Sequence, residues 1–201
     1  MWIVKIGGSL FGDPLLPQWL DLLAELGGGR VTIVCGGGRF ADEVRHAQAH
    51  WQIDDLASHN MAVLAMVQGA YLLRALRPAL EMVPAEAAIR PVLHRGHTAL
   101  WAPFELLRER ADGQSNWNVT SDSIALALAR RLNAERLVLV KSCPVDTRLP
   151  LSALGDAGVL DGAFAAGAVG AGFAIDVVQR DQLAQVRSLL LAGHAPPPAS
   201  P

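Results

Sequence analysis

Short apolar runs alternate with amphipathic segments along most of the chain. The runs at 2–6, 31–35, 136–140 and 173–178 are predominantly apolar, which is typical of strands buried on both faces of a sheet. Between them, apolar residues recur at three- and four-residue spacing, and this predicts helices near 14–26, 40–50, 54–76, 120–132 and 180–191. The alternation predicts an α/β fold, a three-layer α/β/α sandwich around a mostly parallel sheet.

Several residues mark the expected ends of these helices. Asp13 and Pro14 fit the N-cap and first residue of the first helix, and Pro78 ends the long one. Thr120 or Ser121 can cap the helix that starts near them.

Two stretches are less regular, and the last residues differ in composition. Residues 79–115 contain expected short strands near 81–83, 91–93 and 99–101, and the small-residue segment 158–170 gives no clear prediction. We expect one domain over 1–194, followed by a Pro-rich disordered tail at 195–201.

Composition excludes several classes of protein. With 51% hydrophobic and 18% charged residues the chain is predicted to fold, and its net charge of −2 without a basic stripe argues against nucleic-acid partners. No apolar run approaches the ~18 residues of a membrane span, and residues 1–5 lack the layout of a signal peptide, so we expect no membrane association and a cytoplasmic location. Cys35 and Cys143 follow strand-like runs and are predicted to be buried free thiols rather than a disulfide.

Lysine is rare in this chain. Of 17 basic residues only Lys5 and Lys141 are lysines, and each lies at or just after a predicted strand. A lysine ammonium is a compact, flexible point charge that can follow a phosphate group. Ligand sites of open α/β sheets form at the carboxyl ends of strands, so both lysines are candidate site residues.

Glycine-rich turns follow the first two predicted strands. Gly7, Gly8 and Ser9 come directly after the first strand, and Gly36–Gly38 lie between the second strand and a helix. Backbone N–H groups without side chains can form an anion-binding nest, and a helix N-terminus favours phosphate. Either turn could instead be purely structural, and neither matches the P-loop or the dinucleotide fingerprint.

Polar residues gather at two later points. Asn118, Thr120 and Asp122 open a helix rich in small residues, where capping is one role and a site a second. Lys141 follows four apolar strand residues, so it is either a solvated strand end or a site residue.

Taken together, four motifs in this order resemble those of the amino acid kinase family, which includes acetylglutamate, aspartate, carbamate and uridylate kinases. The matching segments are Lys5–Ser9 for K-x-G-G-S, Gly36–Gly38 for G-G-G, Asn118–Asp122 for N-x-x-x-D, and Leu137–Asp146 for a strand leading to an aspartate. The resemblance covers about residues 2–146. It implies ATP-dependent transfer of a phosphoryl group to a small molecule, without a covalent enzyme intermediate, and a homo-oligomeric assembly.

The resemblance also implies roles for individual residues. Lys5 would stabilise the transferring phosphoryl group, Asp122 would orient Lys5 and a second cation, and Asn118 would contact the acceptor or the phosphates. Lys141 would be the second catalytic cation or face the nucleotide, and Mg²⁺ would arrive with ATP, bound chiefly by phosphates and water. Phosphate or nucleotide binding is implied for Gly7, Gly8, Ser9, Gly36, Gly37, Gly38, Ser142 and Asp146.

The chain departs from the family pattern in ways that bear on the substrate. The segment 55–61 lacks the arginine with which relatives grip acidic amino acids, which argues against such an acceptor. No lysine follows Lys141, so either Lys141 or Arg180 replaces the usual C-terminal lysine, or one cation is missing.

The Ser-His-Asn-Met-Ala segment at 58–62 and the compact length resemble one branch, the kinases of methanofuran biosynthesis. These kinases convert an aminomethyl-furan methyl phosphate to its diphosphate. A phosphate acceptor needs extra cations, for which Arg39 and Arg45 are candidates. A uridylate-kinase-like enzyme and a non-catalytic nucleotide-binding storage or sensor protein remain alternatives.

Histidines offer one further candidate and no metal site. His59 either contacts the acceptor or is a buried helix histidine. His46 and His50 stand four residues apart, yet without a third ligand they are more consistent with a solvated helix face.

Overall fold

The computed structural model describes residues 1–110 and 117–192. The tail predicted at 195–201 and the domain boundary predicted at 194 lie outside the described residues.

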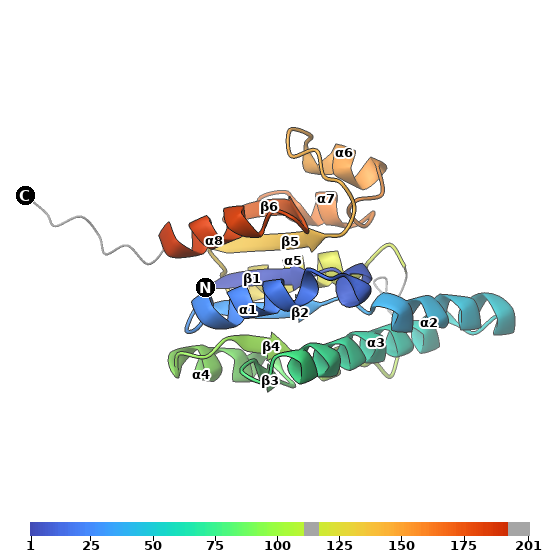
Figure 1. Cartoon of the computed structure of the whole chain (residues 1–201). Coiled ribbons are helices and arrows are strands. Elements are labelled where there is room, and N and C mark those ends of the chain that lie inside the picture. The colour runs from blue at the N-terminus through green and yellow to red at the C-terminus, as the bar shows by residue number, and fades with distance from the viewer. Residues whose placement is uncertain (111–116, 193–201) are drawn as a thin grey trace, which may run out of the picture.

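In the described part of the chain a single six-stranded sheet forms the centre, and every strand pair in it is parallel (Figure 1). The spatial order is β3-β4-β2-β1-β5-β6. The chain leaves β1 toward β2 on one side, while β5 pairs with the other side, so the connections diverge at β1. Ligands of open α/β sheets bind at such a divergence, beyond the carboxyl ends of the strands. The strands are β1 (Trp2–Ile6), β2 (Val31–Cys35), β3 (Glu81–Val83), β4 (Ala99–Trp101), β5 (Arg136–Lys141) and β6 (Ala174–Gln179).

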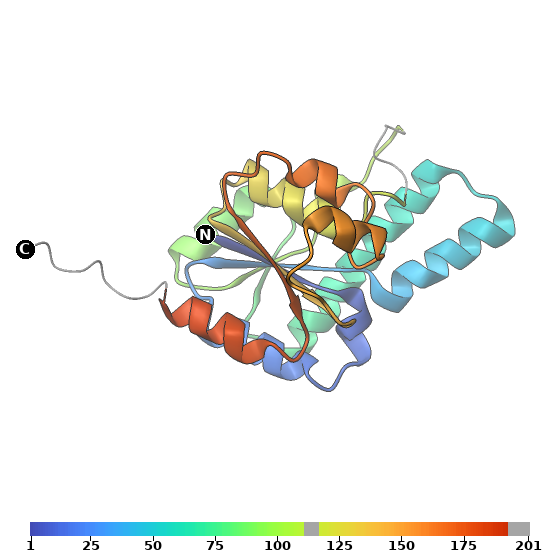
Figure 2. The same cartoon turned by 90° about the horizontal axis from the view of Figure 1, so that it is seen from above.

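Helices cover both faces of this sheet, which confirms the predicted three-layer sandwich (Figure 2). One core joins the sheet to α1, α3 and α8, and a second joins its other face to α4, α5, α6 and α7. The helix α2 packs on α3 and η1, and the α2–α3 pair projects beyond the carboxyl ends of the strands. The helices are α1 (Leu16–Leu26), α2 (Gly38–Trp51), α3 (Asp55–Leu76), α4 (Ile89–His94), α5 (Ser121–Arg131), α6 (Leu151–Asp156), α7 (Phe164–Ala168) and α8 (Leu183–Ala192), with 3₁₀ turns η1 (Gly8–Gly12), η2 (Glu86–Ala88) and η3 (Phe104–Leu106).

Two local predictions from sequence were wrong, and one unassigned segment proves to contain a helix. Residues 91–93 are helical because Ile89, Val92 and Leu93 are all buried, and the spacing i, i+3, i+4 puts them on one helix face. Asp13 does not cap α1, which begins at Leu16; its carboxylate instead accepts a hydrogen bond from the Leu15 N–H. The unassigned segment 158–170 contains α7.

The helix α3 is long and apolar enough, by length and composition, to cross a membrane. In its most apolar window 44% of the residues are buried inside the protein, and the helix packs against α2 and the sheet. Core helices of globular proteins pass the same test, so this is weak evidence for a membrane span.

Candidate active site

Strand periodicity directs both lysines to the same face of the sheet. Side chains of a strand alternate between its two faces. Ile3 lies in the core beneath α5, and Lys5 follows it by two residues; Leu139 lies in the same core, and Lys141 follows it by two residues. Because β1 and β5 are adjacent and parallel, the two ammonium groups meet beneath the N-terminus of α5.

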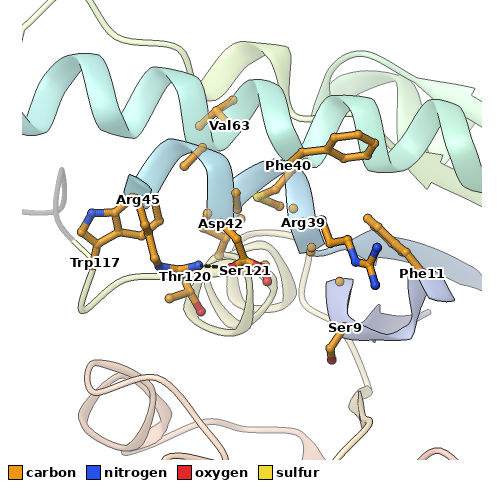
Figure 3. Close-up of a pocket in the computed structure, with 18 of the residues that line it drawn as sticks. Ser9, Phe11, Arg39, Phe40, Asp42, Arg45, Val63, Trp117, Thr120 and Ser121 are labelled. Atoms are coloured by element: carbon orange, nitrogen blue, oxygen red, sulfur yellow. Dashed lines mark hydrogen bonds and ion pairs between the residues drawn. The ribbon is translucent and has the colours of Figure 1, made fainter. Parts of the chain in front are cut away.

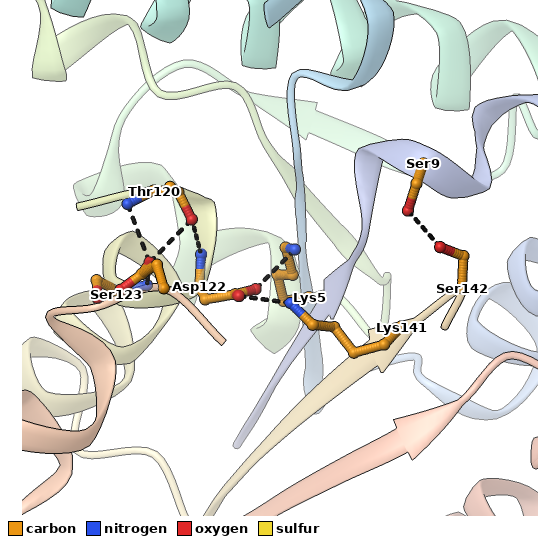
Figure 4. Close-up of polar contacts among 8 residues, drawn as sticks. Lys5, Ser9, Thr120, Asp122, Ser123, Lys141 and Ser142 are labelled. Atoms are coloured by element: carbon orange, nitrogen blue, oxygen red, sulfur yellow. Dashed lines mark hydrogen bonds and ion pairs between the residues drawn. The ribbon is translucent and has the colours of Figure 1, made fainter. Parts of the chain in front are cut away.

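Asp122 bridges these two lysines (Figure 4). It lies in the first turn of α5, and its Oδ1 and Oδ2 are 2.7 Å from Lys5 Nζ and 2.5 Å from Lys141 Nζ. The side chains of Lys5 and Asp122 are only 6% and 4% exposed, and that of Lys141 is 13% exposed. We call these three residues the ionic cluster.

The cluster is electrostatically poised for an anion. Burial disfavours the ionised form of Asp122, but the ammonium groups of Lys5 and Lys141 outweigh it and hold the pKa of the carboxyl below 3.8. Burial, and then the charge of Lys5, lower the pKa of Lys141 below 10.5 against the opposing effect of Asp122. Two ammonium groups and one carboxylate leave a net charge of +1, which a phosphate can neutralise.

The two glycine turns contact each other beside this cluster. A Cβ on Gly8 would lie 2.1 Å from the Gly38 amide nitrogen and 2.5 Å from its Cα. A Cβ on Gly36 would lie 2.7 Å from the Gly8 nitrogen, and Gly38 has a φ of +53°, a conformation that side chains disfavour. Close backbone approach therefore requires glycine at these positions.

Backbone hydrogen bonds divide the glycines into two groups. The Gly7 N–H donates to the Val140 carbonyl and the Gly36 N–H to the Ile6 carbonyl, so both extend the sheet. The phosphate contact that the family resemblance implied for the Gly7 N–H therefore does not fit. Gly8 and Gly38 lie at the starts of η1 and α2, where the first amides have no partner within the helix.

A cavity of about 850 Å³ opens at this point, between η1, α2, α3 and the start of α5 (Figure 3). Eight of the predicted site residues line it: Gly8, Ser9, Gly36, Gly37, Gly38, Arg39, Arg45 and His59. The remaining ones, Lys5, Gly7, Asn118, Asp122, Lys141, Ser142 and Asp146, are not part of its lining. Ser121, next to Asp122, does line it and joins the cavity to the ionic cluster.

Ser142 and Asp146 have separate environments at the end of β5. The hydroxyls of Ser142 and Ser9 are 2.7 Å apart, which links the end of β5 to the first glycine turn. Asp146 instead forms two side-chain hydrogen bonds with exposed Arg148.

The far end of the cavity combines aromatic and charged groups. The guanidinium of Arg45 lies 4.3 Å from the ring centre of Trp117, whose Nε1 donates to Gln48 Oε1 at 2.5 Å. His59 Nε2 lies 3.0 Å from the Leu106 carbonyl oxygen, so this half-buried ring is held by η3 while it lines the cavity.

The two candidates for the missing C-terminal lysine have different partners. Lys141 joins Lys5 on Asp122, whereas the Arg180 guanidinium pairs with Asp13 at 2.6 Å. Arg180 also lines the cavity. The position of the second cation in the ionic cluster is therefore occupied by Lys141.

Sequence reasoning missed two residues of this region. Ser58 is 2% exposed and lines the cavity, and its hydroxyl has no hydrogen-bond partner among the described residues. Asp161 lies in the segment that gave no prediction and contacts the start of α5. For Ser58 a signal existed, since the hydroxyl sits on a helix beside His59, but burial of that face cannot be read from sequence.

The cysteines are both free, as predicted, but only one is buried. The Cys35 thiol donates to the Met66 carbonyl at 3.1 Å, and burial raises its pKa to about 12. Cys143 is exposed, contrary to the prediction, because the strand ends at Lys141 and the following residues leave the sheet.

Among residues 1–110 and 117–192 no group of three or more His, Cys, Asp or Glu side chains could hold a metal ion. Asp122 is engaged by two lysines. A magnesium ion that arrives with a nucleotide would be held chiefly by the phosphates and water.

The chain is similar to known proteins in both sequence and fold. The model of the amino acid kinase family matches residues 1–144. A curated relative from Methanocaldococcus jannaschii, (5-(aminomethyl)furan-3-yl)methyl phosphate kinase, is 28% identical over 144 residues, which cover 69% of this chain and 64% of the relative. The match thus spans just under two thirds of that relative's length.

Two solved structures share the fold. Uridylate kinase from Archaeoglobus fulgidus superposes with a TM-score of 0.69 at 13% identity, covering 93% of this chain and 95% of that one. An isopentenyl phosphate kinase superposes with a TM-score of 0.63 at 14% identity, covering 96% of both chains.

Proposed function

Because this chain belongs to the amino acid kinase family, we propose that it transfers the γ-phosphoryl group of ATP to a small acceptor that already carries a phosphate. The acceptor we favour is an aminomethyl-furan methyl phosphate, which would become a diphosphate. One observation carries the proposal: a buried Lys-Asp-Lys cluster lies beside two touching glycine turns that line a cavity.

The ionic cluster suits a phosphoryl transfer in which the protein neutralises negative charge, rather than one in which it accepts a proton. In an in-line reaction an acceptor oxygen forms a bond to the γ-phosphorus while the bond to the β-phosphate oxygen breaks, and ADP leaves with the electron pair. Lys5 and Lys141 would neutralise the transferring group, and Asp122 would hold both ammonium groups in place.

The state of Asp122 favours a phosphate acceptor. Its pKa lies below 3.8, so this carboxylate is too weak a base to deprotonate a hydroxyl. A phosphate monoester is mostly a dianion at pH 7 and attacks without a general base. Arg39 lines the cavity directly after the second glycine turn and would pair with the acceptor phosphate.

The names of similar proteins support the same acceptor class. The curated relative is a kinase of a furan methyl phosphate, and the two structural neighbours are a uridylate kinase and an isopentenyl phosphate kinase. The furan compound is preferred because its kinase is 28% identical to this chain, whereas the two structural neighbours are 13% and 14% identical. Uridylate is the second candidate, on the strength of the fold match alone.

The test is an acceptor panel with purified protein, ATP and Mg²⁺, followed by ³¹P NMR. The panel contains the aminomethyl-furan methyl phosphate, UMP, isopentenyl phosphate and acetylglutamate. We expect a diphosphate product from the furan compound. Faster turnover of UMP would refute the furan assignment, and tight ATP binding without turnover of any acceptor would favour a nucleotide-binding storage or sensor protein.

A further inference from the structure

Asp161, in the loop between α6 and α7, binds the start of α5 from outside the helix. Its Oδ2 accepts hydrogen bonds from the Thr120 N–H at 2.9 Å, the Thr120 hydroxyl at 2.8 Å and the Ser123 N–H at 3.0 Å. Its Oδ1 accepts from the Ser123 hydroxyl. A single carboxylate thus takes four hydrogen bonds from Thr120 and Ser123, the two residues that flank Ser121 and Asp122.

A second contact joins the same two segments. The Ala163 N–H donates to the Asn118 carbonyl at 3.1 Å, so the loop at 161–163 is tied to the chain before α5 as well as to its first turn. These bonds join residues about 40 positions apart in sequence, such as Thr120 and Asp161. The backbone that carries Asp122 is therefore held by a tertiary contact and not only by its own helix.

The position of Asp122 needs such support. Its carboxylate reaches two ammonium groups that belong to different strands, and burial leaves little room for a second arrangement. The first N–H groups of a helix have no partner within the helix and fray unless they are capped. The Thr120 hydroxyl lies 3.5 Å from the Asp122 N–H, which is a weak cap, whereas the contacts of Asp161 are short.

We propose that Asp161 is a positioning residue for the ionic cluster, which fixes the first turn of α5 so that Asp122 bridges Lys5 and Lys141. The role does not involve contact with substrate. The kinetic part of its test rests on the proposed function, whereas the spectroscopic part does not.

The decisive measurement uses the fact that the chain has only two lysines. Protein labelled with ¹³C at the lysine ε-carbon gives two signals, which Lys5→Arg assigns. The ionisable groups that act on Lys141 are Lys5 from β1, Asp122 from α5 and the Cys143 thiol beyond β5, and Asp122 raises the pKa of Lys141. In Asp161→Asn we expect the Asp122 carboxylate to lie less closely against the Lys141 ammonium group. The pKa of Lys141 then falls further, and its signal titrates at lower pH than in the wild-type protein.

The kinetic arm follows turnover of the furan phosphate with ATP. We expect Asp161→Asn to lower kcat about tenfold while the KM of each substrate changes about twofold or less, because the lost interaction acts in the transition state. Asp161→Glu keeps a carboxylate and is expected to recover part of kcat. Asp156→Ala removes an exposed aspartate of the preceding helix and is the matched control, with both readouts unchanged.

Ser123→Ala guards against a variant that fails to fold, because it removes one of the four hydrogen bonds without touching Asp161 or the lysines. It should shift the Lys141 titration in the same direction by a smaller amount. If Asp161→Asn and Ser123→Ala lower the melting temperature but leave the lysine titration and kcat at wild-type values, Asp161 is merely structural and the proposal is overturned. If no acceptor is turned over and the titration still shifts, the proposed function fails while the positioning role stands.

Discussion

The helices α2 and α5 both begin beside the same cavity, yet their N-termini differ. The start of α2 is formed by Gly37 and Gly38, with no side-chain cap and no acidic residue in its first turn. The start of α5 carries Asp122, is capped by Thr120 and receives the carboxylate of Asp161. A helix N-terminus favours negative charge; at α5 the protein's own carboxylates supply it, whereas no carboxylate lies in the first turn of α2.

Under the proposed function, the start of α2 binds phosphate and the start of α5 organises the charged groups. At α2 the glycine backbone lines the cavity, and the close approach of the two turns requires glycine at Gly8 and Gly38. At α5 the Asp122 carboxylate pairs with the ammonium groups of Lys5 and Lys141. Variants at the two helix starts should separate these roles, and the largest effect is expected at the lysines that Asp122 of α5 pairs with.

Removing the ammonium group of Lys141, which pairs with Asp122 of α5, should abolish most of the activity. We expect Lys141→Ala to lower kcat by about 10³-fold, in line with the ~4 kcal/mol that one oriented charge or donor supplies to a transition state. Initial rates with ATP and the best acceptor measure the effect. Arg148→Ala, an exposed cation seven residues later, is the control and should keep full activity. A kcat within tenfold of wild type for Lys141→Ala would remove this lysine from the mechanism.

Adding a side chain where the two glycine turns touch should lower the free energy of unfolding more than it lowers the catalytic rate. Gly8→Ala forces its Cβ against the Gly38 backbone, and we expect about 3 kcal/mol of lost unfolding free energy in urea titrations. Gly12→Ala is a matched control in the same 3₁₀ turn, because a Cβ there meets nothing within 4 Å. Equal stability of the two variants would mean that the turns do not need their close approach.

The pH dependence of kcat should report the protonation state of Lys141, which pairs with Asp122 at the start of α5. Lys141 acts when protonated, which requires a pH below its pKa in the folded protein. Burial, followed by the charge of Lys5, lowers that pKa, so activity should fall as pH rises at values below the ordinary 10.5. A pH–rate profile at saturating substrates measures it. A flat profile up to pH 10.5 would show that Lys141 keeps its proton more firmly than the buried geometry implies.

Much of this arrangement was predictable from sequence because it follows from periodicity. Strand alternation predicts that Lys5 shares a face with Ile3 and Lys141 with Leu139, whereas the pairing of β1 with β5, which brings the two lysines together, is known only from the structure. The glycine turns were recognisable for the same reason, since each follows a buried strand.

Long-range contacts were the part that sequence could not provide. Asp161 reaches α5 across about 40 residues, from a segment with neither a strand nor a helix period. Residues 91–93 looked like a strand because three positions cannot distinguish the two periods. The partners of a polar residue depend on how elements pack, and a local pattern does not record this.

The smallest predicted effect concerns Ser58, on the α2 side of the cavity. Its buried hydroxyl lacks a partner among the described residues, which costs stability unless a ligand supplies one. We expect Ser58→Ala to raise the unfolding free energy by about 1 kcal/mol and to raise the KM of the acceptor about fivefold with little change in kcat. Thr32 is the matched control. Its hydroxyl is also buried and has no hydrogen-bond partner among the described residues, but Thr32 does not line the cavity. Thr32→Val should therefore gain similar stability with KM unchanged, and equal KM values for the two variants would mean that Ser58 does not contact the acceptor.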